Sequence, residues 1–355
     1  MTDAPKSSLH GWLPEEIAQL CAELGQPPFR ARQLWRWLHV RRVTTWERMT
    51  NIPAALRSAL AARFTLEPCV SRAVTGERTG TRKLLVGLQD GEAVETVIIP
   101  AGRRQTVCVS SQVGCRYGCA FCASGQAGFR RNLEAGEMVG QVLLAMQELA
   151  GPGGDAVRPD NLVFMGMGEP LDNYTAVLKA IRIMNAPEGL AIGARRITVS
   201  TCGLIAGIER LAGEGLQIEL SVSLHAPEDG LRSRLLPVNR KYPLRELLTA
   251  CAAYARTTGR IVTFEYVLIQ GVNDARAQAV QLAGLLKPLP CRVNLIPLSA
   301  VEEFQGQPAP PAVARMFVDI LARAGINATV RVSKGAEIQA ACGQLRLRTL
   351  PPTTP

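Results

Sequence analysis

Residues 114–122 read Gly-Cys-Arg-Tyr-Gly-Cys-Ala-Phe-Cys. The three cysteines Cys115, Cys119 and Cys122 have the spacing C-x3-C-x2-C, with Phe121 directly before the last of them. Iron–sulfur clusters are held by cysteine thiolates, usually four. Three thiolates in one short loop leave one iron of a cubane open to a distant ligand or to a substrate. The stretch therefore predicts a [4Fe-4S] site with an open iron.

Two simpler interpretations of the cysteines fit less well. Structural zinc sites combine Cys pairs with further Cys pairs or with His, whereas this chain has one C-x2-C pair and only His10, His39 and His225. Ten cysteines in 355 residues are too few for a small disulfide scaffold. The chain begins Met-Thr-Asp-Ala-Pro-Lys, without an apolar signal segment. We therefore expect a reduced, cytoplasmic protein.

The length and charge indicate a large domain with a smaller one and a polyanionic partner. The chain has 355 residues, and 40 Lys+Arg against 30 Asp+Glu give a net charge of +10. No apolar run is long enough to span a membrane, so we expect no membrane association. Nothing in the sequence indicates an obligate oligomer, and we expect a monomer.

The basic residues gather near the N-terminus. From Leu24 to Trp46 there is no acidic residue, and aromatic residues such as Trp35 alternate with arginines. These arginines are Arg30, Arg32, Arg36, Arg41 and Arg42. Basic side chains neutralise phosphates and aromatic rings stack on unpaired bases, but the same rings could form a small helical core. We expect some rings in a core and the arginines outside it, near RNA.

The pattern of apolar residues divides the chain into segments. Residues up to about Phe64 predict short helices, with helical spacing in 13–24 and 30–39. Residues 83–88 and 94–99 predict two strands of a β-hairpin, because Asp90-Gly91 between them is a turn signal. We expect a helical RNA-binding domain over 1–69, a hairpin connector over 70–100, a barrel core over 101–335 and a C-terminal segment over 336–355.

Strands and helices alternate from about residue 105. The predicted strands are 106–110, 161–165, 196–200, 217–223, 261–268 and 292–297, and the predicted helices are 136–149, 174–184, 244–255, 275–286 and 312–324. Repeated βα units predict a parallel sheet with helices outside, and six of them fit an incomplete α/β barrel that is open on one side. Barrel chemistry lies at the C-terminal ends of the strands, and the cysteine triplet follows the first strand.

Small and polar residues follow several of these strands. Gly168 and Glu169 follow the second strand, Ser200 ends the third, and Ser223 and His225 end the fourth. Glycine lets a ligand approach the backbone, and a carboxylate accepts hydrogen bonds from an ammonium group. Any one of these residues could belong to an ordinary turn, but together they predict one pocket at the barrel mouth.

Three further residues have both a structural and a chemical interpretation. Cys342 lies between small residues in Ala-Ala-Cys-Gly-Gln-Leu, which suits a thiol that large partners must approach. Cys108 lies seven residues before the triplet on the first predicted strand. Both could be buried structural cysteines, the usual fate of a free Cys. Glu95, within an apolar strand, could be an ordinary edge carboxylate.

The chain resembles the RlmN family of radical S-adenosylmethionine (SAM) RNA adenine C2-methyltransferases over nearly its whole length. The resemblance rests on Cys108-Val-Ser-Ser-Gln-Val-Gly-Cys115, Gly128-Phe-Arg-Arg-Asn-Leu133, Gly166-Met-Gly-Glu-Pro170, Ser223-Leu-His225, Gly271-Val-Asn-Asp274 and Ala341-Cys-Gly-Gln-Leu345. The N-terminal Pro28-Phe29-Arg30-Ala31 also resembles the family's helical RNA-binding domain. The resemblance implies a radical SAM barrel and a role in 23S rRNA and, in some bacteria, tRNA modification.

The resemblance also implies roles for individual residues. Cys115, Cys119 and Cys122 would hold the [4Fe-4S] cluster. The implied SAM contacts are Gly168, Glu169, Ser200, Ser223, Leu224, His225 and Ser299. Cys342 would carry a methyl group, Cys108 would resolve the adduct through a disulfide, and Glu95 would be the base.

Adenine C2 explains why such parts are needed, since it is an electron-poor carbon that ordinary SAM transfer cannot methylate. The resemblance implies two SAM molecules per turnover: one methylates Cys342, and the second gives a 5′-deoxyadenosyl radical that activates this methyl group. Glu95 would take the C2 proton within hydrogen-bond reach. Reduction would come from a flavodoxin- or ferredoxin-like donor.

Two departures and two rival hypotheses accompany the resemblance. Ser299 stands where many members have a SAM-contacting asparagine, and Lys334-Gly335-Ala336-Glu337 replaces the usual Arg-Gly-Asp-Asp. The nearest rival is the C8-specific relative Cfr, which shares the cluster and both reactive cysteines. A rival of another class is a non-catalytic RNA-binding protein with a structural metal site.

Overall fold

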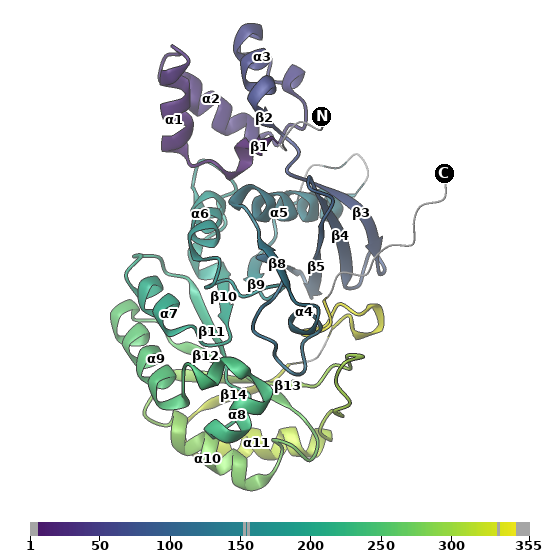
Figure 1. Cartoon of the computed structure of the whole chain (residues 1–355), viewed down its shortest axis with the longest axis vertical. Coiled ribbons are helices and arrows are strands. Elements are labelled where there is room, and N and C mark those ends of the chain that lie inside the picture. The colour runs from purple at the N-terminus through teal and green to yellow at the C-terminus, as the bar shows by residue number, and fades with distance from the viewer. Residues whose placement is uncertain (1–5, 152–153, 155–156, 332–333, 346–355) are drawn as a thin grey trace.

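One large sheet runs through the computed structural model, which describes residues 6–151, 154, 157–331 and 334–345. Its ten strands follow the order β14-β13-β12-β11-β10-β9-β6-β5-β4-β3 (Figure 1). The strands of this sheet are β3 (Cys69–Thr75), β4 (Arg82–Leu88), β5 (Ala93–Ala101), β6 (Arg104–Cys108), β9 (Asn161–Phe164), β10 (Ile197–Thr201), β11 (Glu219–Ser223), β12 (Val262–Leu268), β13 (Cys291–Pro297) and β14 (Asn327–Val330). Two small sheets pair β1 (Ser7–Ser8) with β2 (Phe64–Thr65) and β7 (Gln112–Gly114) with β8 (Phe129–Asn132).

Strands β6 and β9 to β14 are parallel and form an open barrel, because β14 and β3 are the two unpaired edges of the sheet. The six strands predicted from the sequence are confirmed as β6 and β9 to β13. Every residue of β12 is buried, as expected for a parallel strand covered on both faces. The sequence analysis missed β14, a short edge strand whose Asn-Ala-Thr-Val lacks an apolar run.

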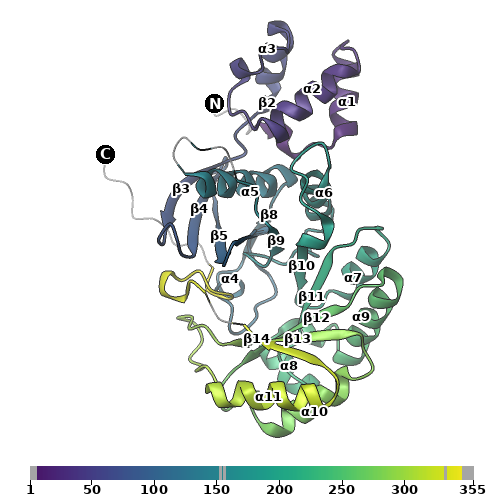
Figure 2. The same ribbon diagram turned by 180° about the vertical axis from the view of Figure 1, so that it is seen from behind.

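Helices connect the parallel strands and cover the outside of the sheet (Figures 1 and 2). They are α5 (Ala135–Ala150), α6 (Tyr174–Asn185), α7 (Ile205–Ala212), α8 (Asp229–Leu235), α9 (Leu244–Thr258), α10 (Arg276–Leu286) and α11 (Pro311–Arg323). The five predicted barrel helices correspond to α5, α6, α9, α10 and α11, whereas the shorter α7 and α8 were missed. A one-turn helix, α4 (Ala123–Gln126), follows the cysteine triplet directly.

The predicted hairpin is present as β4 and β5, but it continues the barrel sheet and does not stand apart from it. β5 pairs antiparallel with β6, and β3 adds a further antiparallel strand beyond β4. An unpaired edge at β6 would expose a row of backbone donors and acceptors, and these three strands cover it. Glu95 therefore lies on β5, the direct neighbour of the strand β6 that carries Cys108.

The N-terminal helices α1 (Pro14–Glu23), α2 (Phe29–Trp35) and α3 (Ala54–Arg63) form a group at one end of the molecule (Figure 1). The predicted helix over 30–39 is α2 followed by a π-helical stretch, Arg36–Val40. Trp35 is buried and its Nε1 donates to the Glu188 carbonyl at 3.0 Å, which ties this group to the barrel. Of the five arginines expected outside the core, Arg32, Arg36 and Arg41 are exposed, whereas Arg30 and Arg42 are half-buried.

No helix in the described part of the chain is both long and apolar enough to cross a membrane. The first five residues of the expected N-terminal segment and residues 346–355 of the C-terminal one lie outside the described residues.

Candidate active site

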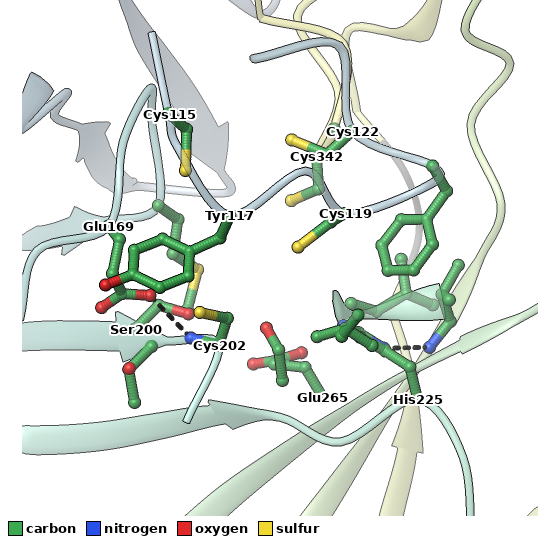
Figure 3. A pocket seen from close by; sticks show the side chains of 18 of the residues that line it. Cys115, Tyr117, Cys119, Cys122, Glu169, Ser200, Cys202, His225, Glu265 and Cys342 are labelled. Carbon is green, nitrogen blue, oxygen red and sulfur yellow. Dashed lines mark hydrogen bonds between the residues drawn. The ribbon is translucent and has the colours of Figure 1, made fainter. Parts of the chain in front are cut away.

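A cavity that is partly open to solvent lies at the C-terminal ends of β9 to β13. The loop with the three cysteines covers one side of it, and the segment with Cys342 closes another (Figure 3). The predicted site residues that line it are Cys115, Cys119, Cys122, Gly168, Glu169, Ser200, Ser223, His225, Ser299 and Cys342. Residues more than 200 positions apart in the chain therefore face one space.

The cysteine loop is held by backbone hydrogen bonds to neighbouring segments. Cys115 N–H donates to the Gly128 carbonyl at 2.9 Å, and Ala120 N–H donates to the Leu235 carbonyl at 2.9 Å. Burial is the main cause that raises the pKa of all three thiols, to about 12 for Cys115, and the neighbouring thiols add to it. Without a metal these thiols are therefore neutral at pH 7.

The three cysteines fit a cubane cluster better than a single ion. Within the described residues, no three His, Cys, Asp or Glu side chains converge closely enough to hold one metal ion. Thiolates of a cubane each bind a different iron, so they stand further apart than the ligands of one ion. All three thiols border the same cavity.

Glu169 is a buried carboxylate fixed by backbone donors. Its Oε1 accepts from Leu171 N–H at 3.0 Å and its Oε2 from Cys202 N–H at 2.7 Å. Burial raises the pKa of Glu169, and these hydrogen bonds oppose the increase. Gly168 has φ +98°, and a Cβ there would lie 2.5 Å from the Gln112 side chain, so only glycine fits. The pair can present a fixed acceptor to an ammonium group.

His225 is held as a neutral acceptor beside the cysteine loop. Its Nδ1 accepts from Val267 N–H at 2.9 Å, so Nε2 carries the proton. Burial, with the nearby charge of Arg232, lowers the pKa of His225 to about 3. The residue has φ +57°, an uncommon conformation outside glycine, and its ring meets Phe121 edge-on at 4.9 Å.

Leu224 is the one predicted SAM contact that does not border the cavity. Its side chain is fully buried in the core, and its backbone forms hydrogen bonds with neighbouring segments of the barrel. Its N–H donates to the Glu265 carbonyl at 3.0 Å and its carbonyl accepts from Arg232 Nε at 3.2 Å. Leu224 therefore supports Ser223 and His225 on either side of it, which do reach the cavity.

Cys342 is presented to the cavity by a segment that docks on the cysteine loop. Gly343 has φ +85°, and its carbonyl accepts from Ala123 N–H at 2.7 Å. A Cβ on Gly343 would lie 2.9 Å from the Phe121 carbonyl oxygen, so the close approach requires glycine. Gln344 Nε2 donates to the Ala300 carbonyl at 2.8 Å. The exposed surface of Cys342 faces this cavity (Figure 3).

Cys108 and Glu95 lie behind the cavity wall and do not line it. Cys108 is 6% exposed, and burial together with Cys342 raises its pKa to about 12. Glu95 is buried on β5, with its Oε1 2.9 Å from Lys83 Nζ. Lys83 Nζ also donates to the Gln339 carbonyl at 3.1 Å, three residues before Cys342. Lys83 thus links Glu95 to the segment that carries Cys342.

Sequence reasoning missed four residues that shape the site. Tyr117, Glu265 and Arg331 line the cavity, and Tyr117 donates to Asp172 Oδ1 at 3.1 Å. Arg232 is fully buried behind the strand ends. A glutamate in the apolar run of β12 was a signal that the sequence analysis did not use. The sequence around Tyr117, Arg232 and Arg331 does not indicate a role in the site, because their partners are distant in sequence.

Arg232 joins the ends of two barrel strands. Its Nη2 donates to the Cys202 carbonyl at 2.8 Å and to the Ser223 carbonyl at 3.0 Å. Its Nη1 donates to Asn239 Oδ1 at 2.8 Å and its Nε to the Leu224 carbonyl. One buried guanidinium thereby fixes the backbone from which Ser223 and His225 face the cavity.

Comparisons with known proteins agree with this site. Residues 109–283 match the radical SAM superfamily, and residues 8–66 match the family described as the ribosomal RNA large subunit methyltransferase N-terminal domain. A crystal structure of a radical SAM methyltransferase from Sphaerobacter thermophilus is 47% identical, covers 96% of this chain and 99% of its own, and has a TM-score of 0.91. The fold and the site define the chain as a radical SAM enzyme, which uses SAM and a [4Fe-4S] cluster.

Curated relatives cover nearly the whole chain. A probable dual-specificity RNA methyltransferase RlmN from Moorella thermoacetica is 51% identical over 95% of this chain and 96% of its own length. The protein of the same description from Symbiobacterium thermophilum is 49% identical over 97% of this chain and 92% of its own. The dual-specificity RNA methyltransferase RlmN of Alkalilimnicola ehrlichii is 45% identical over 93% of this chain and 91% of its own length. The chain belongs to the RlmN family of radical SAM methyltransferases.

Proposed function

We propose that this enzyme methylates C2 of an adenine in 23S rRNA and of an adenine in tRNA. The observation that carries the proposal is the exposed thiol of Cys342 in the same cavity as the three cluster cysteines. A radical SAM site needs no such thiol to generate a radical, but methyl transfer to an electron-poor carbon needs a carrier. The relatives named as dual-specificity RNA methyltransferases support both RNA classes.

The cluster would be held by Cys115, Cys119 and Cys122, and with bound SAM it supplies the radical chemistry. Glu169 would accept the SAM ammonium group, since its carboxylate is already fixed by two backbone donors. Ser200, Ser223 and Ser299 would provide hydroxyl groups to the rest of SAM. We further propose two SAM molecules per turnover, one to methylate Cys342 and one for the radical step.

Three residues would act on the RNA adduct. Cys342 would hold the adenine through its methylene carbon, and Glu95 would take the C2 proton. Glu95 must then leave its 2.9 Å ion pair with Lys83, which a shift of the Cys342 segment on RNA binding would allow. Cys108 would attack the Cys342 sulfur, break the carbon–sulfur bond and leave a disulfide. The Cys342 thiol is near enough to Cys108 to contribute to its raised pKa, which supports this last step.

The N-terminal helices would bind the phosphate backbone of the RNA. Arg32, Arg36 and Arg41 are exposed there, and no acidic residue lies between Leu24 and Trp46 to oppose a polyanion. The target adenine would have to leave its stack to reach a cavity inside the barrel. A flavodoxin- or ferredoxin-like protein would supply electrons to a monomeric enzyme in the cytoplasm.

Nucleoside analysis tests the proposed function. The cluster-loaded enzyme is incubated anaerobically with SAM, a reductant and either rRNA or tRNA lacking the modification, and the digested RNA is examined by mass spectrometry. We expect 2-methyladenosine from both. 8-Methyladenosine alone would favour the C8-specific rival, and the absence of both methyladenosines and of 5′-deoxyadenosine would favour the non-catalytic rival.

A Cys342→Ala variant separates the carrier from the cluster. It should keep its iron, because Cys342 is not among the three cluster cysteines, but it should give no methylated RNA. A Cys291→Ala variant is a suitable control, since Cys291 begins β13 at a distance from the cavity lining. Normal methylation by Cys342→Ala would refute the role of Cys342 as carrier.

A further inference from the structure

Asp172 joins the cysteine loop to the turn that carries Glu169. Its Oδ1 accepts from the Tyr117 hydroxyl at 3.1 Å, and its Oδ2 accepts from Gln112 Nε2 at 2.8 Å. Arg116 Nε lies 3.0 Å from the same Oδ2 in an ion pair. All three donors come from the segment that begins the cysteine loop, whereas Asp172 follows Glu169 by three residues. One carboxylate therefore connects two segments that are distant in the sequence.

Gln112 carries this connection on to Glu169 itself. Its side chain is fully buried, and its Oε1 accepts from Glu169 N–H at 2.8 Å. Nε2 of the same amide donates to Asp172 and to Asn132 Oδ1, so these two acceptors determine which way the amide faces. The Asp172 side chain thereby also helps to hold the backbone of Glu169 in place.

The polar contacts between the two segments converge on this one side chain. In the described part of the chain, every hydrogen bond and ion pair between residues 115–122 and residues 166–172 ends on Asp172. The Arg116 side chain is 50% exposed, so solvent screens its ion pair, and Tyr117 provides the stronger tie. Tyr117 also borders the cavity (Figure 3). On this side, the polar contacts that position the cysteine loop thus depend on one carboxylate.

The methionine end of SAM would need both segments at once. In the function proposed above, the three cysteines hold a cluster with an open iron, and Glu169 accepts the SAM ammonium group. A ligand group that is held from two sides binds tightly only when both sides stand at the right separation. The rest of SAM would contact other strand ends, so its binding does not depend on this separation.

We propose that Asp172 is a positioning residue that holds the cysteine loop in register with Glu169 and so sets the affinity for the methionine end of SAM. The inference rests on the use of this cavity for SAM in the function proposed above. Asp172 does not border the cavity, and it acts through Tyr117 and Gln112, which connect it to the cysteine loop and to Glu169.

The test compares two ligands on the cluster-loaded protein, measured anaerobically by calorimetry. SAM has the methionine end, whereas 5′-methylthioadenosine has the nucleoside but lacks the amino-acid group. In Asp172→Ala the affinity for SAM should fall by about tenfold or more, as for other groups that orient metal ligands, and that for 5′-methylthioadenosine should stay within about twofold. Asp160→Ala is the matched control, because Asp160 lies at the opposite end of β9 and accepts from Gln105 N–H at 2.7 Å.

A double-mutant cycle tests the route through Tyr117. Tyr117→Phe removes the hydroxyl but keeps the ring, so the affinity for SAM should fall by about threefold to tenfold. In the Asp172→Ala background the same replacement should change it by less than about twofold, because the hydroxyl has already lost its partner. The electron paramagnetic resonance spectrum of the reduced cluster gives a second readout, and its half-maximal change should need about tenfold more SAM in Asp172→Ala.

Three outcomes would overturn the proposal. They are an Asp172→Ala affinity for SAM like that of the control, an equal loss for 5′-methylthioadenosine, and a Tyr117→Phe effect that is as large without Asp172 as with it. Iron content is determined for every variant, so that loss of the cluster is not mistaken for loss of affinity. The test contains no RNA, so a wild type that binds SAM but forms no 2-methyladenosine would refute the proposed function alone.

Discussion

Replacing Arg232 should loosen the strand ends that carry the proposed SAM contacts Ser223 and His225. In Arg232→Met the apolar chain can fill much of the same space, but four acceptors lose their donor: the carbonyls of Cys202, Ser223 and Leu224, and Asn239 Oδ1. Each buried unsatisfied acceptor costs about 1–3 kcal/mol. Four such acceptors lose a donor, and removal of the buried guanidinium charge offsets part of the total cost, so we expect a net loss of about 3–5 kcal/mol.

A loss of about 3–5 kcal/mol corresponds to a melting temperature lower by roughly 4–7 °C for a chain of this size. The assay is thermal unfolding of the cluster-loaded protein followed by circular dichroism, with SAM affinity measured in parallel. SAM affinity should fall too, because Ser223 and His225 lie on the released backbone. Arg234→Met is the control, since Arg234 is exposed on the same helix. Equal melting temperatures for the two variants would refute the reasoning.

Three further predictions concern single contacts. Cys108→Ala should trap a covalent enzyme–RNA adduct, visible as a shifted gel band, because no thiol remains to release Cys342. Burial lowers the pKa of His10 to about 4 and that of His39 well below its usual value, so both are neutral in the fold. Their stabilisation is complete above pH 6.5 and is lost as the pH falls toward 4, and the double variant His10→Gln/His39→Gln should have a melting temperature that depends less on pH in this range. Lys83→Met should cost about 3 kcal/mol, because it removes the ammonium group that pairs with the buried Glu95 carboxylate at 2.9 Å.

Each of these predictions has an outcome that contradicts it. Full turnover by Cys108→Ala without an adduct would remove the resolving role, and Cys291→Ala serves as its control. If the melting temperature of the double histidine variant fell between pH 7 and 5 as much as that of the wild type, groups other than His10 and His39 would cause the pH dependence. For Lys83→Met, the comparison is Lys287→Met on the opposite part of the barrel, and equal melting temperatures would mean that the Glu95 ion pair contributes nothing.

The sequence alone predicted the positions of six barrel strands and the three candidate cluster cysteines. Periods of apolar residues reflect which faces are buried, so they predict β6 and β9 to β13 without knowledge of their neighbours. The spacing of Cys115, Cys119 and Cys122 is local, and three ligands within eight residues constrain the chemistry before any folding is known.

Only the tertiary structure decided which distant groups meet. The link from Lys83 to both Glu95 and Gln339, the four hydrogen bonds of Arg232 and the three polar contacts of Asp172 depend on segments far apart in the chain. A side chain's type gives its capacity to donate or accept, but not whether that capacity is already used. That is decided by burial and by the neighbours that the fold supplies, which is why Cys108 and Glu95 lie behind the cavity wall while Cys342 faces the cavity itself.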